Sequence, residues 1–230
     1  MDHLLKKKII PTGVIIPEPN TKLDKIKINL GHRGLIWMQC KSQGTVIHSG
    51  LLRTEDNAIL KMNNFVNKVY NLFPKEPTRI NGVPSSSCRL TYINSGLDKG
   101  FRRTPSHCFA DLDVRISPLE KNDDVLEKIK SIACKFDIEI SIIKNTPAAA
   151  ISKNEKIVRV ITDVLKEEKV DYELGYASPT CDAHWFINKG IPAINGMGAT
   201  GDNVHASNEY IVLESIYDRI KTFKQIINKL

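Results

Sequence analysis

Residues 181–210 read CDAHWFINKGIPAINGMGATGDNVHASNEY, and this stretch contains the features that decide the fold. It predicts a short helix beginning at Asp182, a buried strand at residues 191–194, and then a glycine-rich loop that holds His205. Glycines on both sides of a polar loop let the backbone bend tightly near a ligand. A histidine in such a loop is suited to binding a metal or a substrate, and the alternative is an ordinary surface histidine.

Segments on either side of this stretch continue an alternation of helices and strands. The spacing of apolar residues predicts helices at residues 157–165 and 213–230. Near the start of the chain, Val14–Ile16 is a short apolar run bounded by prolines, which predicts a buried strand followed by a linker. This order is typical of an α/β domain.

The middle of the chain has a different pattern. It predicts a hairpin at 35–47, a helix at 58–73 started by Glu55, Asp56 and Asn57, a strand broken by an Asn81-Gly82 turn at 79–93, a strand at 107–116, a helix at 125–136, a strand at 138–143 and a linker at 145–147. The order is βαββαβ-like, so we expect two helices on one face of an antiparallel sheet.

Composition limits the class of protein. The chain has 230 residues, of which 41% are hydrophobic, and a net charge of +7. Its lysines are dispersed, and Lys6-Lys7-Lys8 is the only tight basic cluster, so we interpret the charge as a solvated surface rather than a nucleic-acid interface. No apolar run is long enough to span a membrane. Five cysteines without a Cys-x-x-Cys spacing indicate reduced, mostly buried thiols in a cytoplasmic protein.

Four motifs occur in order along the chain: residues 14–20 (VIIPEPN), residues 31–50 with GHRG and GTVIHSG, residues 108–118 (CFADLDVRISP), and residues 181–210. Together they resemble the co-catalytic zinc hydrolase family that includes aminoacylase, acetylornithine deacetylase, succinyl-diaminopimelate desuccinylase and carboxypeptidase G. The resemblance spans nearly the whole chain. It implies an α/β fold in which a partial zinc-hydrolase catalytic domain, residues 1–29 and 146–230, carries an inserted α+β ferredoxin-like dimerisation domain at residues 30–145.

Several motifs of that family have no counterpart here. The family carries a His-x-Asp motif, a bridging aspartate and a Glu-Glu pair before its Glu-Pro strand, and none of them is among the seventeen residues before Glu18. We therefore expect the chain to be the carboxyl-side portion of such an enzyme. The outer pieces are too short for a full catalytic sheet, so an unpaired sheet edge or an exposed apolar face should make the purified chain associate.

The resemblance assigns Glu18 and His205 as metal ligands. A carboxylate at the carboxyl end of a strand and a neutral imidazole both suit zinc, although cobalt or manganese can share such ligands. In the family the two residues belong to different metals of a bridged pair. The chain alone is therefore expected to bind zinc weakly.

Three further residues are candidates for catalysis or substrate binding. By resemblance, His48 reaches the active site of the other subunit of a homodimer and stabilises the oxyanion; otherwise it is a surface histidine. Arg115 is expected to bind a substrate carboxylate, and the alternative is an exposed ion pair with Asp111 and Asp113. The family often has an asparagine where this chain has Arg102, and the added positive charge favours an anionic substrate.

The remaining polar residues of the motifs are interpreted as structural. Asp182 is expected to cap the helix that follows it. His32, His107 and His184 have no partner spacing and are assigned to the core or the surface.

The function expected from these residues is that of a metal-dependent amidohydrolase, of the deacylase or carboxypeptidase type, acting on N-acyl amino acids or small peptides. Metal-bound hydroxide would attack the amide carbonyl. The isolated chain is expected to be inactive, because the general-base glutamate belongs to the part that is missing. Two alternatives stay open: a non-catalytic dimerising remnant and one subunit of a split enzyme.

Overall fold

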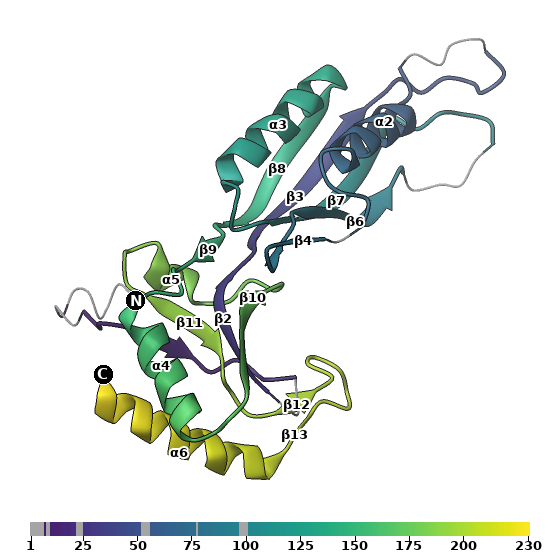
Figure 1. Ribbon diagram of the computed structural model, residues 1–230. Coiled ribbons are helices and arrows are strands. Elements are labelled where there is room, and N and C mark those ends of the chain that lie inside the picture. The colour runs from purple at the N-terminus through teal and green to yellow at the C-terminus, as the bar shows by residue number, and fades with distance from the viewer. Residues whose placement is uncertain (1–6, 8–9, 22–24, 52–55, 77, 97–100) are drawn as a thin grey trace. The chain divides into compact units, whose positions relative to one another are not determined.

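The computed structural model describes residues 7, 10–21, 25–51, 56–76, 78–96 and 101–230 (Figure 1). The chain forms two compact units: unit 1 is Met1–Arg33 together with Ala149–Leu230, and unit 2 is Gly34–Ala148. Glu55, and Lys6 and Lys8 of the basic cluster, lie outside the described residues. Among the helices of the described part, none has the length and apolar character needed to cross a bilayer.

Unit 2 has the predicted βαββαβ order. Its elements are β3 (Gly34–Gln43), α2 (Ala58–Tyr70), β6 (Ser87–Asn94), β7 (His107–Ile116), α3 (Asn122–Lys135) and β8 (Ile138–Thr146), with a small hairpin of β4 (Arg79–Ile80) and β5 (Val83–Pro84) before β6. The sheet has the strand order β6-β7-β3-β8, and every neighbouring pair is antiparallel. Figure 1 shows α2 and α3 on the same face of this sheet. The predicted ferredoxin-like architecture is thereby confirmed.

The core of unit 2 follows from the alternation of its strands. Every second residue of β7, from Cys108 to Ile116, is buried, and Ile36 and Met38 of β3 are buried beside them. These side chains belong to one apolar cluster with Phe65 of α2 and other buried residues of both helices. Burial of one such side chain contributes about 1.5–3 kcal/mol, so the cluster as a whole is the main source of stability of the unit.

Local signals set the ends of α2 and the turn between β4 and β5. The Asn57 side chain accepts hydrogen bonds from the backbone of Ile59 and Leu60, which satisfies two amides at the start of α2. Asn81 and Gly82 have φ values of 51° and 80°, the left-handed conformations that a two-residue type I′ turn requires.

The predicted hairpin at residues 35–47 is wrong. Residues Gly34–Gln43 form one ten-residue strand, β3, which pairs with β7 on one side and β8 on the other. This segment contains no glycine after Gly34 and no turn dipeptide, so the chain has no means of reversing within it.

Unit 1 is built on a mixed sheet with the strand order β1-β11-β2-β10. Its elements are β1 (Val14–Ile16), β2 (Ile26–His32), β9 (Ala149–Ala150), α4 (Lys156–Glu167), β10 (Tyr172–Ala177), α5 (His184–Ile187), β11 (Ala193–Gly196), β12 (Gly201–Asp202), β13 (Tyr210–Ile211) and α6 (Leu213–Lys229). β1 runs parallel to β11, and β2 runs parallel to β10. Helices α4 and α6, green and yellow in Figure 1, lie side by side.

The predicted linker between the first strand and unit 2 is wrong for residues 26–32. These residues form β2, which lies between β11 and β10, while β1 and β10 are the edges of the described sheet. Ile26, Ile28 and Leu30 of β2 are buried in one cluster with α4 and α6. Lysines at positions 25 and 27 conceal this short apolar alternation in the sequence. β10 likewise has no counterpart among the predicted elements.

Candidate functional site

The parallel pairing of β1 with β11 brings Glu18 beside the glycine-rich loop. Both strands end at the same edge of the sheet, and the chain continues from each as a paired segment, with the Gly198 N–H donating to the Glu18 carbonyl (2.9 Å). A Cβ atom at Gly198 would lie 2.4 Å from the Pro17 carbonyl oxygen and 2.5 Å from that of Glu18. Glycine at position 198 therefore permits the contact. The Glu18 side chain is exposed.

His205 lies on the loop between β12 and β13 of the same unit. Its φ is 69°, a left-handed conformation that is uncommon outside glycine and asparagine. The backbone N–H of His205 donates to the Glu209 carboxylate (3.1 Å), which holds the loop in this conformation. The imidazole is exposed, and its ring nitrogens have no hydrogen-bond partner among the described residues. The side-chain amide of the nearby Asn203 donates a hydrogen bond to the Asn208 carbonyl (3.4 Å).

Glu18 and His205 offer one carboxylate and one imidazole, both chemically suited to zinc. A catalytic zinc ion usually has three protein ligands and a water. Within the ranges that the structure describes, no group of three or more His, Cys, Asp and Glu side chains could hold a metal ion. The donor set is therefore incomplete, and the described residues do not form a catalytic metal centre by themselves.

A thiol and a buried asparagine lie near Glu18, and the sequence pattern does not indicate them. Cys181 accepts a hydrogen bond from the Asn195 amide (2.6 Å). Burial raises the pKa of the Cys181 thiol, and the carboxylates of Glu18 and Asp182 raise it further, against the hydrogen bonds from Ala183 and Asn195. Asn195 is 1% exposed, and its Oδ1 atom has no partner in the described structure. The contact joins the segment before α5 to β11, and the two residues are 14 positions apart in the sequence. No local signal therefore reveals it.

Two histidines interpreted as structural meet in the interior of unit 1. The rings of His32 and His184 pack edge to face with centroids 5.8 Å apart. His32 is fully buried; its Nδ1 atom lies 3.0 Å from the Arg33 carbonyl oxygen, and its Nε2 atom has no partner among the described residues. Burial lowers the pKa of His32, and the neighbouring His184 lowers it further, although the Arg33 carbonyl and Asp182 raise it. Both residues are in the core of unit 1, which is one of the two positions that the sequence left open for them.

In unit 2, His48 and Arg102 lie on two neighbouring, mostly exposed segments, residues 44–51 and 101–106, which together form a ribbon. His48 bridges to Arg103 in antiparallel fashion, and the Ser49 N–H donates to the Arg102 carbonyl (2.9 Å). The His48 Nδ1 atom accepts from the Gly50 N–H (3.1 Å), so the proton of the neutral ring is on Nε2. The exposed edge of the His48 ring is therefore a hydrogen-bond donor.

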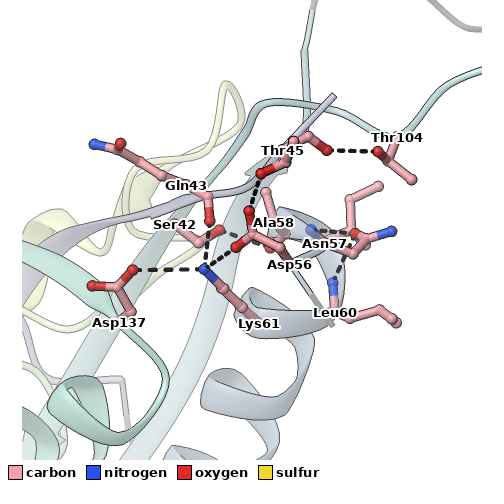
Figure 2. Close-up of polar contacts among 11 residues, drawn as sticks. Ser42, Gln43, Thr45, Asp56, Asn57, Ala58, Leu60, Lys61, Thr104 and Asp137 are labelled. Atoms are coloured by element: carbon pink, nitrogen blue, oxygen red, sulfur yellow. Dashed lines mark hydrogen bonds and ion pairs between the residues drawn. The ribbon is translucent and has the colours of Figure 1, made fainter. Parts of the chain in front are cut away.

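Lys61 anchors the base of this ribbon. Figure 2 shows its ammonium group between the Gln43 carbonyl (2.9 Å), Asp56 (2.8 Å) and Asp137 (3.6 Å). Asp56 also accepts from the Thr45 hydroxyl, and the hydrogen bond from Lys61 is the main cause that lowers the Asp56 pKa. The same bond raises the pKa of Lys61. The Thr104 hydroxyl in turn donates a hydrogen bond to the Thr45 carbonyl (2.8 Å). This network therefore joins both segments of the ribbon to the start of α2.

Arg115 on β7 makes a bidentate pair with Asp113, through Nε (2.7 Å) and Nη2 (2.8 Å). Both side chains are about three-quarters buried, so the pair is held more firmly than a fully exposed one. The alternative interpretation predicted an ion pair of this kind, but an exposed one. A substrate carboxylate would have to compete with Asp113 for the guanidinium, and the substrate-binding role of Arg115 stays a prediction.

Comparison with known proteins agrees with the resemblance that the motifs indicated. Residues 30–141 match the peptidase dimerisation domain of the M20 family. The chain is 26% identical over 219 residues to the LysW-lysine/LysW-ornithine hydrolase of Saccharolobus islandicus, and 24% identical over 245 residues to the succinyl-diaminopimelate desuccinylase of Helicobacter hepaticus. These alignments cover 94% and 100% of this chain but only 58% and 59% of the two relatives.

Solved structures show the same fold. An M20 family metallo-carboxypeptidase from Sulfolobus solfataricus superposes with a TM-score of 0.76 at 19% identity, over 98% of this chain and 65% of that one. The aminopeptidase PepT from Bacillus cereus superposes with a TM-score of 0.72 at 16% identity, over 97% and 60% of the two chains. At such identities the likeness concerns the fold alone.

Proposed function

We propose, because the chain is related to the M20 peptidases and deacylases, that it forms part of a metal-dependent amidohydrolase acting on N-acyl amino acids or small peptides. The observation that carries the proposal is the pairing of the Glu18 segment with the loop after β11, which leads to His205. Both candidate ligands thus belong to the segments that follow the carboxyl ends of β1 and β11, where ligands of α/β sheets bind.

The chain's own residues have separate roles in this proposal. Glu18 and His205 each hold zinc, or cobalt or manganese, and other ligands come from outside the described residues. His48 donates its Nε2 proton toward the oxyanion in the site of the second subunit of a homodimer. Lys61 and Asp56 keep the His48 ribbon in position, and Arg102 attracts an anionic substrate.

The test is zinc-dependent hydrolysis of a panel of N-acetyl and N-succinyl amino acids and dipeptides. The purified chain is assayed alone and with any polypeptide encoded just upstream, in the presence of Zn²⁺, Co²⁺ or Mn²⁺. Activity that requires the second polypeptide and is lost in His205→Ala, but not in His107→Ala, supports the proposal. Activity of the chain alone would contradict the inference that its set of metal ligands is incomplete. No hydrolysis under any condition would overturn the amidohydrolase proposal.

The second candidate function is a non-catalytic dimerising protein, which the lack of a three-ligand group among the described residues favours. Isothermal titration with Zn²⁺ distinguishes it. Weak binding that His205→Ala abolishes supports a partial metal site, whereas zinc binding unaffected by His205→Ala and Glu18→Gln supports the non-catalytic alternative. Tight binding that is lost in His205→Ala would mean that the chain completes a site by itself.

A further inference from the structure

A cavity of about 440 Å³ in unit 1 is lined by charged side chains that form no ion pair with any other described residue. It lies where the beginning of β2, the end of α4 and the first turns of α6 meet. Its cations are Lys25, Arg219 and Lys221, and its carboxylates are Glu168, Asp171, Glu214 and Asp218. None of them forms an ion pair within the described residues. Charges of both signs therefore face one cavity without forming ion pairs with each other.

Arg219 is the cation best placed to bind an anion. Its side chain is partly buried, and its Nε donates to the Gly198 carbonyl (3.2 Å). A guanidinium carries five N–H donors, and the others have no partner in the described structure. Burial lowers the pKa of Arg219, and the neighbouring Asp218 carboxylate raises it. Such a planar, partly desolvated donor suits a carboxylate.

Glu168 is the complementary anion. Its Oε2 atom accepts a hydrogen bond from the Thr222 hydroxyl (2.8 Å), which fixes the carboxylate at the cavity wall. Its Oε1 atom is buried and has no hydrogen-bond partner among the described residues. A buried carboxylate oxygen without a donor is unfavourable, and an ammonium group that reached it would supply the missing donor.

We propose that this cavity binds a small zwitterion of the amino-acid type, with its carboxylate on Arg219 and its ammonium group on Glu168. The two residues line the same cavity and do not pair with each other, which leaves room for a ligand that bridges them. The cavity volume is within the roughly 300–1,000 Å³ of small-molecule sites. Neither Glu18 nor His205 lines it, so the proposal stands independently of the amidohydrolase proposal.

The proposed ligand site is also linked to the sheet edge where the Glu18 segment contacts Gly198. The Gly198 carbonyl accepts from Arg219, while the Gly198 N–H donates to the Glu18 carbonyl. A ligand on Arg219 would therefore lie one hydrogen bond away from the peptide that contacts the Glu18 segment.

The experiment is a ¹⁵N–¹H NMR titration of the full 230-residue chain with three probes of similar length: L-norleucine, hexanoate and n-pentylamine. L-Norleucine is expected to produce saturable shifts at the amides of Gly198, Thr200 and Ser215. Hexanoate and n-pentylamine each lack one charge and should bind at least tenfold more weakly. Equal binding of hexanoate and L-norleucine would overturn the zwitterion assignment, and no saturable shift with any probe would overturn the site.

Two variants test the two contacts. Glu168→Gln keeps the volume and an acceptor for Thr222 but removes the charge, and Arg219→Gln removes the guanidinium; each should weaken L-norleucine binding at least tenfold. Lys224→Gln, on an exposed position of α6 outside the cavity, should bind as the unsubstituted chain does. Thermal unfolding checks that Arg219→Gln still folds without its bond to Gly198. Unchanged affinity in Glu168→Gln would overturn the ammonium contact whatever the behaviour of Arg219→Gln.

Discussion

Gly198 shows how one residue without a side chain positions a candidate ligand. Because a Cβ atom at this position would collide with the carbonyl oxygens of Pro17 and Glu18, Gly198→Ala must push the loop away from the Glu18 segment. We expect the free energy of unfolding to fall by about 1–3 kcal/mol, measured by urea denaturation.

The matched control for this substitution is Gly175→Ala. Its Cβ atom would meet only the Lys27 side chain, at 3.7 Å, which is an ordinary contact. The stability of this variant should therefore change little. Equal losses of stability in the two variants would contradict the steric explanation.

His32 should make the stability of unit 1 depend on pH. Burial lowers its pKa below the usual 6.5 in the folded state, so the unfolded chain binds a proton more readily than the folded one. The contribution of neutral His32 to the free energy of unfolding is present above pH 6.5. It is lost as the pH falls from 6.5 through the lower pKa of His32 in the folded state. Urea denaturation of the chain and of His32→Gln between pH 5 and 8 measures this. An equally steep loss of stability in His32→Gln would assign the dependence to other groups.

At the scale of single elements, the helices and the strands of unit 2 were largely predictable. The helix at 58–73 is confirmed as α2, because its apolar spacing and its Asn57 cap are both local signals. β2 was missed, since its alternation is short and is flanked by lysines. β10 was missed as well; its residues are only partly buried, so its sequence shows no strong apolar pattern.

The Asn57 cap gives the test at this scale. Asn57→Ala removes the acceptor for the backbone amides of Ile59 and Leu60, so we expect a loss of about 1 kcal/mol in the free energy of unfolding. Asn63→Ala, on the exposed face of the same helix, should be neutral or slightly stabilising because alanine favours helix. Urea denaturation of both variants measures the difference, and a cost in Asn63→Ala as large as in Asn57→Ala would contradict a capping role.

At the scale of the whole molecule, unit 2 has the features of an independent domain. It has its own apolar core, and its two ends are adjacent, since a Cβ atom on Gly34 would lie 2.6 Å from the backbone nitrogen of Ala148. We expect a polypeptide of residues 34–148 to unfold cooperatively in urea and to sediment as a dimer, as the match to a dimerisation domain suggests. A monomer, or a gradual non-cooperative transition, would contradict this expectation.

The sequence by itself determined the βαββαβ order of unit 2, the main helices of both units, and the types of residue suited to metal and substrate. These depend on neighbours within one turn or one strand, so the local pattern contains them. Only the tertiary structure decided which segments meet. The Glu18 segment and Gly198 are distant in the sequence, and the parallel pairing of β1 with β11 brings them together at one sheet edge.

The same holds for the contacts that no motif indicated. Cys181 with Asn195, His32 with His184, and the cavity shared by Glu168 and Arg219 each join different elements of unit 1. Such contacts arise from the packing of segments that are distant in sequence, and this packing depends on the summed burial of many apolar side chains. No single residue pattern contains that sum, which is why the buried polar partners became visible only in the folded molecule.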